Sequence, residues 1–155
     1  MPKKILVSSC LTGKKCSYDG KTRTNNRIIE LCVRRGCIDV CPEIEGGLGC
    51  PRERHEIDGG DGADVLEGRA RVISLSGSDH TENFLKGAEA TLKKALENGV
   101  SLAIMKARSP SCGAHKIHSG KFDGTLKSGS GVTTALLKRH DIRVFTEEEV
   151  EEGRF

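Results

Sequence analysis

The sequence has few aromatic residues: it contains no tryptophan, one tyrosine and four phenylalanines among its 155 residues. Proteins that bind single-stranded nucleic acid stack the bases on aromatic side chains, so this scarcity argues against that kind of ligand. The core must instead be built from Ile, Leu, Val and Ala. Long apolar runs are missing as well, since none reaches the roughly 20 residues that cross a membrane or forms the core of a signal peptide. We therefore expect a cytoplasmic protein with no membrane partner.

A large excess of charge of one sign is also missing. The 25 basic and 22 acidic residues give a formal net charge of +3, and the two signs are mixed along the chain without a long basic block. Binding of tRNA is therefore disfavoured, and no RNA-binding module is recognisable. The length fits a single domain over residues 1–155, with a core large enough to fold without metals or disulfides. No feature of the sequence predicts an oligomeric state.

The seven cysteines do not include a Cys-x-x-Cys pair, and this absence argues against a zinc knuckle or ribbon. Thiols stay reduced in the cytoplasm and their number is odd, so we do not expect a disulfide framework. Cys32 and Cys37 fall in apolar runs, where a lone cysteine usually acts as a small buried apolar residue. Metal binding or thiol chemistry is left for the other five.

Short apolar runs alternate with amphipathic segments along the chain. The runs predict strands over residues 4–8, 37–41, 101–105 and 142–145, and the amphipathic segments predict helices over residues 27–35, 80–98 and 132–137. The residues from Thr146 to Glu149 resemble a capping box that begins a short terminal helix. This order predicts a single-domain, Rossmann-like α/β fold with a mainly parallel sheet flanked by helices.

Three further expectations concern loops and helix faces. Residues 42–62 show little periodicity and are expected to form a long functional loop, followed by a small hairpin over residues 69–75. The glycines before Val132 are expected to leave free backbone amides for a partner at a helix N-terminus. In the longest helix, residues at four-residue spacing are expected to form the buried stripe: Phe84, Ala88, Leu92 and Leu96.

Cys10, Cys41 and Cys112 each follow an apolar run that predicts a strand. The carboxyl ends of parallel strands meet at one edge of a sheet, which is where ligands bind in open α/β folds. Three thiolates at this edge suit a soft metal, either an iron-sulfur cluster or zinc. The alternative is that each cysteine merely ends a strand. Cys16, in a polar loop, is the best candidate for an additional ligand.

Several other residues near these cysteines could carry chemistry. Glu43 could act as a general acid or base, or it could simply cap the start of a loop. Ser109 and Ser111 could supply catalytic hydroxyls or satisfy backbone groups of the turn. Arg108 could hold a substrate oxygen or anion, or face the solvent. Gly46-Gly47 is only a weak sign of a binding loop, because the Walker lysine and the dinucleotide fingerprint are absent.

Taken together, the motifs resemble those of the thiouracil desulfidase family over nearly the whole chain. They are Ser9-Cys10-Leu11-x-Gly13-x-x-Cys16-x-Tyr18-Asp19-Gly20, Cys41-Pro42-Glu43-x-x-Gly46-Gly47-Leu48, Pro51-Arg52, Lys106-x-Arg108-Ser109-Pro110-Ser111-Cys112-Gly113 and Gly129-x-Gly131-Val132-Thr133. The resemblance implies a [4Fe-4S] cluster bound by Cys10, Cys41 and Cys112, with one iron not bound by cysteine. Cys16 also matches the motif, so a cluster with four cysteine ligands stays open.

The resemblance also implies an activity. It is the [4Fe-4S]-dependent, hydrolytic desulfuration of a thiolated pyrimidine similar to 2-thiouracil, a C-S lyase or hydrolase type of reaction in sulfur metabolism. The sulfur would leave on the open iron, and the substrate would be a small thiolated nucleobase or nucleoside. Glu43, Ser109 and Ser111 would be catalytic, while Arg108, Gly46 and Gly47 would bind the substrate. The rival is a non-catalytic iron-sulfur or zinc-binding protein that takes part in cluster or sulfur transfer.

Overall fold

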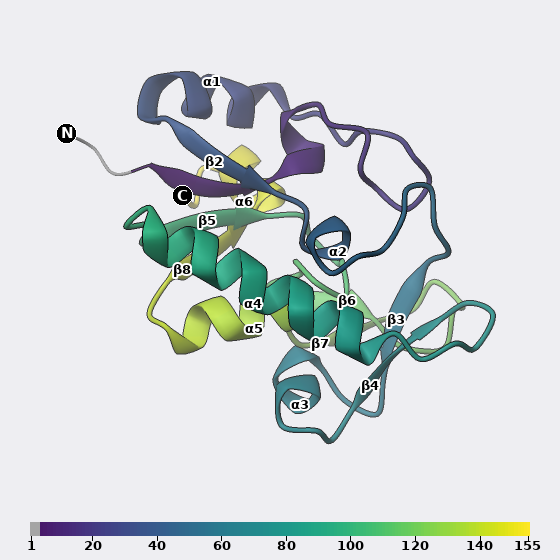
Figure 1. Ribbon diagram of the computed structural model, residues 1–155. Coiled ribbons are helices and arrows are strands. Elements are labelled where there is room, and N and C mark those ends of the chain that lie inside the picture. Colours follow the sequence, from purple (N-terminus) through teal and green to yellow (C-terminus); the bar gives the residue numbers. More distant parts are fainter. Residues whose placement is uncertain (1–3) are drawn as a thin grey trace.

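The computed structural model describes residues 4–155 and contains a central sheet of four parallel strands (Figure 1). They are β1 (Ile5–Ser8), β2 (Cys37–Val40), β5 (Leu102–Met105) and β8 (Arg143–Thr146), in the spatial order β2-β1-β5-β8. β1 and β5 occupy the centre of the sheet, where both faces are covered, and this explains their continuously apolar sequences. The predicted α/β fold with a mainly parallel sheet is confirmed.

Helices cover both faces of this sheet (Figure 1). The flanking helices are α1 (Asn26–Arg35), α4 (Thr81–Glu97), α5 (Val132–Arg139) and α6 (Glu147–Glu151). Alternate residues of β1 face the two layers. Ile5 and Val7 share a core with residues of α1 and α6, while Leu6 shares a core with residues of α4 and α5. The sheet is therefore the middle of three layers.

A group of shorter elements lies beyond the carboxyl end of the sheet (Figure 1). They are the 3-10 helix η1 (Ser9–Thr12), α2 (Pro42–Glu45), β3 (His55–Asp58), α3 (Gly62–Leu66), β4 (Arg71–Ser74), β6 (Lys116–His118) and β7 (Leu126–Ser128). β3 pairs antiparallel with β4, and β6 pairs antiparallel with β7. Ile57 and Val72 of the first pair form a third core, separate from the two on the faces of the sheet, with Phe84 and Ala88 of α4.

The expectation of one long loop over residues 42–62 is wrong, because this segment contains α2 and β3. The expected hairpin over residues 69–75 is also wrong. Residues 71–74 form the single strand β4, and its partner is β3, which lies outside the expected segment. Sequence periodicity misses β3 because two of its buried residues are polar. His55 lies with its Nε2 atom 2.7 Å from Nδ1 of His80, and Glu56 accepts hydrogen bonds from backbone amides of the β6–β7 loop.

The buried stripe of α4 differs from the expected one at its C-terminal end. Phe84 and Ala88 are buried as expected, but Leu96 is 55% exposed. A step of four residues turns the helix by about 400°, so a stripe at constant four-residue spacing drifts by about 40° per step. The observed stripe corrects this drift with one step of three residues, from Ala88 to Thr91, and continues to Ala95.

Cys32 and Cys37 form a disulfide with a Cα–Cα distance of 5.0 Å, so the expectation of two reduced, buried thiols is wrong. Cys32 lies in the last turn of α1 and Cys37 begins β2. Gly36 between them has a φ of 77°, which reverses the chain within one residue. The disulfide lies at the start of β2, whereas Cys41 follows the end of the same strand.

Capping side chains mark the start of two helices, one of them at the expected capping box. The side chain of Asn25 accepts a hydrogen bond from the amide of Ile28 at 3.3 Å, and Thr146 and Glu149 form a complete capping box on α6. Within residues 4–155, no helix is both long enough and apolar enough to cross a membrane.

α2 and α4 meet at two glycines, and this contact places Glu43. A Cβ atom on Gly46 would lie 2.0 Å from the carbonyl oxygen of Asn83, and one on Gly87 would lie 2.0 Å from that of Pro42. The side-chain amide of Asn83 also donates to the carbonyl oxygen of Gly46 at 2.8 Å. The two backbones can approach this closely only without side chains at these positions.

We predict that Gly87→Ala destabilises the protein, although alanine is favoured over glycine by about 1 kcal/mol inside a helix. The added methyl group must push α2 away from α4, at an expected cost of about 1–3 kcal/mol. Urea denaturation gives the free energy of unfolding. Gly49→Ala is the control, because a Cβ there meets nothing within 4 Å. An increase in stability for Gly87→Ala would contradict the close contact.

Candidate active site

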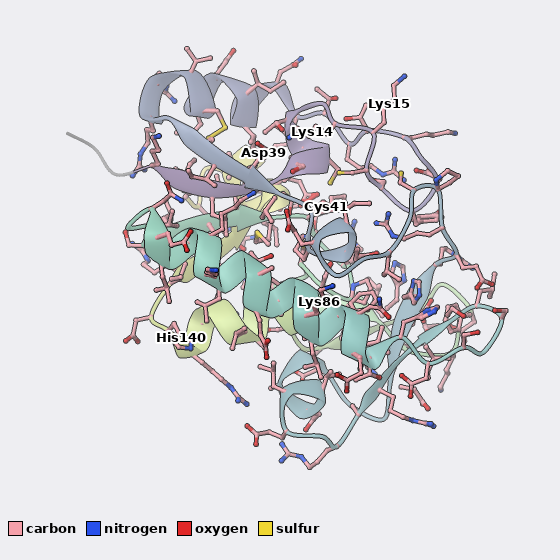
Figure 2. All side chains as sticks on the ribbon, in the orientation of Figure 1. Lys14, Lys15, Asp39, Cys41, Lys86 and His140 are labelled. Carbon is pink, nitrogen blue, oxygen red and sulfur yellow. A yellow bond between two sulfur atoms is a disulfide. The ribbon has the colours of Figure 1, made fainter. Side chains whose placement is uncertain are left out.

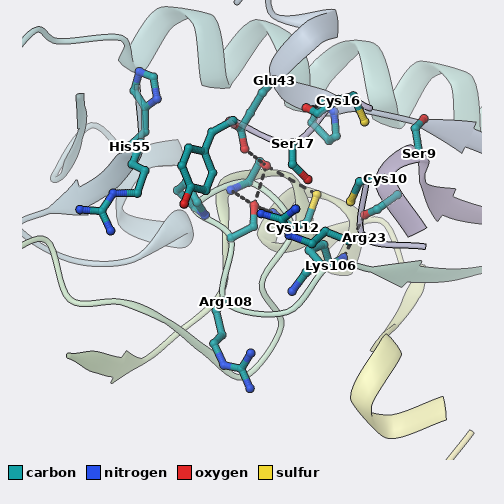
Figure 3. Close-up of a pocket in the computed structure, with 18 of the residues that line it drawn as sticks. Ser9, Cys10, Cys16, Ser17, Arg23, Glu43, His55, Lys106, Arg108 and Cys112 are labelled. Carbon is teal, nitrogen blue, oxygen red and sulfur yellow. Dashed lines mark hydrogen bonds between the residues drawn. The ribbon is translucent and has the colours of Figure 1, made fainter. Parts of the chain in front are cut away.

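Four cysteines line one cavity of about 330 Å³ at the carboxyl edge of the sheet (Figure 3). Cys10 lies in η1 directly after β1, Cys41 directly follows β2, and Cys112 lies in the loop after β5. These three strands are neighbours in the sheet, so their carboxyl ends deliver the three thiols to the same place. The fourth cysteine, Cys16, comes from the loop that follows η1. The structure thus brings together the three cysteines that the sequence places at strand ends.

Asp39 of β2 helps to hold the turn that carries Cys10. Its Oδ2 atom accepts a hydrogen bond from the hydroxyl of Ser9 at 2.7 Å and lies 2.5 Å from Nζ of Lys14. Figure 2 shows Lys14 beside Asp39, with Cys41 at the end of the same strand. One carboxylate therefore ties the segments of two cavity cysteines together.

Three of the cavity thiols have raised pKa values. Burial raises the pKa of Cys112 to about 12, and a hydrogen bond with the Cys10 thiol raises the pKa of Cys16 to about 11. A hydrogen bond with Cys16 and burial raise the pKa of Cys41 further. Protonated thiols are poor nucleophiles, so Cys112 is not suited to attack a substrate by itself. A bound metal reverses this, because it favours the thiolate.

The arrangement fits an iron-sulfur cluster better than a single ion. Within residues 4–155, no three His, Cys, Asp or Glu side chains are grouped closely enough to hold one metal ion. A zinc site would need such a group. A cuboidal cluster binds each cysteine through a different iron, so its ligands come from separate positions around a cavity. Cys10, Cys41 and Cys112, on three separate segments, match that requirement.

Glu43 forms a nearly buried ion pair with Arg52 beside the cysteines. Its Oε1 atom accepts from Nε of Arg52 at 2.9 Å, and the two side chains are only 12% and 8% exposed. Arg52 also donates to the carbonyl oxygens of Cys16 at 3.0 Å and Gly49 at 3.1 Å. The second carboxylate oxygen, Oε2, accepts from the hydroxyl of Ser111 at 2.9 Å. Glu43 is thus fixed from both sides at the cavity wall.

The two serines around Pro110 have different surroundings. Ser109 Oγ accepts hydrogen bonds from the amides of Ser111 and Cys112, both at 3.1 Å, and therefore closes the turn. Ser111 Oγ lies 2.9 Å from Ser109 Oγ, donates to Glu43 and lies 3.5 Å from the sulfur of Cys112. Ser111 is therefore the hydroxyl that links the carboxylate to a cavity cysteine, while Ser109 lies one hydrogen bond further away.

The N-terminus of α5 supports this loop. The amides of Val132 and Thr133 donate to the carbonyl oxygens of Pro110 and Ser111 at 2.8 and 2.9 Å. A Cβ atom on Gly131 would lie 2.4 Å from the carbonyl carbon of Ser111. The expectation that these amides stay free for a partner is therefore wrong. The glycine permits a close approach, but the group that approaches is the loop of the same chain.

The remaining predicted residues lie away from the cysteine group. Arg108 lines the cavity, but its side chain pairs with Glu148 of α6 and points away from the cysteines (Figure 3). Neither Gly46 nor Gly47 is among the lining residues. Gly46 is buried against α4, so the geometry gives it a packing role.

Sequence reasoning missed part of the charge of the cavity. Five basic residues and two glutamates line it, which gives the wall a positive excess. The basic residues are Arg23, Arg52, Arg54, Lys106 and Arg108. They come from three segments that are far apart in the sequence, so no local charge pattern shows that they line one cavity. Only the motifs that contain Arg52, Lys106 and Arg108 carried a signal.

Comparison with known proteins places this cavity in context. A family model described as 2-thiouracil desulfurase matches residues 5–149. The uncharacterized protein YbbK of Bacillus subtilis (strain 168) is 46% identical over 146 residues, which cover 94% of this chain and 97% of that protein. A solved structure of the [4Fe-4S]-dependent thiouracil desulfidase TudS aligns with a TM-score of 0.85 and 39% identity, over 97% of this chain and 94% of that one.

The Glu43–Arg52 pair gives a prediction about stability. Arg52→Met leaves a buried carboxylate without its cation, and we expect the free energy of unfolding to fall by about 3–5 kcal/mol. Adding Glu43→Gln should restore part of this loss, because a neutral amide needs no counter-ion. Urea denaturation measures both, and Arg54→Met, an exposed neighbour, is the control. Equal effects of the two arginine substitutions would show that the ion pair adds nothing.

Proposed function

Because the chain belongs to the 2-thiouracil desulfurase family, we propose that it is a [4Fe-4S]-dependent desulfidase that converts a thiolated pyrimidine to its oxo form by hydrolysis. One observation carries the proposal: Cys10, Cys41 and Cys112 converge on the cavity that also holds the Glu43–Ser111 pair. The similarity to TudS over nearly the full length of both chains supports it. The substrate is a small nucleobase or nucleoside.

We assign Cys10, Cys41 and Cys112 as the ligands of the cluster, with one iron left without a cysteine. When bound, such a cluster supplies a Lewis-acidic iron that can polarise a carbon-sulfur bond. Cys16 remains a thiol in this assignment. It lies in the polar loop after η1 and not directly at a strand end, so the sheet does not fix it as it fixes the other three.

The protein residues then handle water and protons. Arg52 and Ser111 hold the two oxygens of Glu43, so the carboxylate is oriented before the substrate arrives. Glu43 accepts a proton from a water molecule as the water oxygen attacks the carbon that bears sulfur. The carbon-sulfur bond breaks, and its electron pair leaves with the sulfur. The oxygen of the water stays on the carbon, and its two protons leave with the sulfur as hydrogen sulfide. No electron is gained or lost overall.

We infer a different role for each of the three predicted catalytic residues from its contacts. Ser111 lies between Glu43 and Cys112, so it is placed to steer the attacking water and to pass a proton. Ser109 contacts Ser111 and holds the turn. We therefore assign Glu43 as the general acid and base, Ser111 as its partner and Ser109 as the support of both.

Anaerobic reconstitution with iron and sulfide tests the function directly. We expect a brown protein that converts 2-thiouracil to uracil, followed by chromatography, and that releases one sulfide for each uracil. Cys112→Ala should lose the cluster, whereas Cys16→Ala should keep both the cluster and the activity. The proposal fails if cluster-loaded protein forms no oxo product from any thiolated pyrimidine base or nucleoside. Loss of the cluster in Cys16→Ala would instead favour a closed, non-catalytic cluster with four cysteines.

The catalytic assignment gives a separate kinetic prediction. Glu43→Gln and Ser111→Ala should each lower kcat by about 10²–10⁴-fold, the usual contribution of a positioned acid or base. Ser109→Ala should have a smaller effect because its hydroxyl acts through Ser111. Cluster absorbance, measured on each variant, separates lost chemistry from a lost cofactor. A fully loaded Glu43→Gln variant with the kcat of the unchanged protein would refute the assignment.

A further inference from the structure

Lys106 is a cavity residue that none of the steps above uses. It directly follows β5, lines the cavity with Cys10 and Cys112, and its side chain is only 23% exposed. The ammonium group lies 3.0 Å from Oε2 of Glu147 and donates to the carbonyl oxygen of Ala107 at 3.2 Å. An ammonium group has three N–H donors. Among residues 4–155 these are its two partners, so one donor is left for a ligand.

Glu147, the first residue of α6, fixes both the side chain and the backbone at this point. While Oε2 pairs with Lys106, Oε1 accepts from the amide of Ala107 at 2.7 Å, and the glutamate side chain is 12% exposed. A nearly buried carboxylate with two charge-assisted contacts holds its partners in one geometry. The lysine therefore cannot move to bulk solvent without leaving a buried charge unpaired.

The rest of α6 strengthens this hold on the loop. Glu148 pairs with Arg108, and Oε1 of Glu149 lies 2.6 Å from Nε2 of His115. Three consecutive glutamates thus contact four positions of the segment that carries Ser111 and Cys112. Arg52, another cation of the cavity wall, is held by Glu43 and by two backbone carbonyls, so its side chain is fixed to a different part of the wall.

We propose that Lys106 is a substrate-contacting residue, that its free N–H donor binds an electronegative atom of the thiolated pyrimidine, and that Glu147 is its positioning residue. This inference rests on the proposed function. Attack of water on the thiocarbonyl carbon moves negative charge onto the atoms around it. A cation fixed in a partly buried wall stabilises that charge better than a mobile one in water. In this role Lys106 donates a hydrogen bond and transfers no proton.

The test compares reconstituted, full-length variants. Lys106→Met should raise KM for 2-thiouracil, or lower kcat/KM, by about tenfold or more, the usual loss for a hydrogen bond to a charged group, with unchanged cluster absorbance. Lys106→Arg should restore part of the loss. Glu147→Gln should act in the same direction but more weakly, since its amide oxygen can still accept from Ala107. The double variant should be no worse than Lys106→Met, because the two residues act as one unit.

Two controls separate this role from mere support of the fold. Glu151→Gln changes an exposed residue of the same helix that contacts Asn25, and Lys121→Met removes an exposed lysine of the β6–β7 loop. Both should leave KM within about twofold. Fully additive effects of Lys106→Met and Glu147→Gln, or normal kinetics with a lowered melting temperature, would overturn the inference.

Equilibrium dialysis with 2-thiouracil distinguishes this inference from the proposed function. If the unchanged protein binds 2-thiouracil without converting it and Lys106→Met binds it more weakly, the desulfidase is refuted and the role of Lys106 is supported. Equal binding by both proteins, together with an equal kcat/KM where turnover occurs, overturns the role of Lys106. No binding and no turnover by the unchanged protein overturn both.

Discussion

The site depends on one tight contact, in which the N-terminus of α5 lies against the backbone of Ser111. The amide of Thr133 donates to the carbonyl oxygen of Ser111, and the approach leaves no room for a side chain at Gly131. Connecting loops are usually the mobile part of a domain. Here the helix end fixes the loop, so the hydroxyl of Ser111 meets Glu43 and the neighbouring thiol of Cys112 lines the cavity.

The second constraint is electrostatic. The cavity wall has a positive excess, yet most of its cations have a carboxylate of their own: Arg23 pairs with Asp19, Arg52 with Glu43, Lys106 with Glu147 and Arg108 with Glu148. An unpaired buried charge would be costly, whereas a paired one costs much less. Two of these carboxylates also accept from the backbone, Asp19 from the amide of Lys21 and Glu147 from the amide of Ala107. These ion pairs therefore hold separate segments of the wall together.

Features of the fold and of the site could be predicted where neighbouring residues in the sequence determine them. Continuous apolar runs are local, so the parallel sheet and the position of three cysteines at its carboxyl edge followed from the sequence alone. The burial of Glu56 on β3 depends on amides 64 and 66 residues away, which no periodicity encodes. The partner of Arg52 is similarly visible only in the folded chain. The predicted burial of Leu96 was wrong for another reason, because a spacing of four residues only approximates the helical period of 3.6.

The order of the strands has a consequence for the proposed cluster. The two central strands are far apart in the sequence: Ser8 of β1 contacts Met105 of β5 across 97 residues. Closing so long a loop is slow and costs chain entropy before any contact repays it. Until β5 pairs with β1, the thiol of Cys112 is absent from the cavity, and a partly folded chain presents only the cysteines of its first third. If Cys10, Cys41 and Cys112 bind the cluster as proposed, the central sheet must form before all three ligands are available to it.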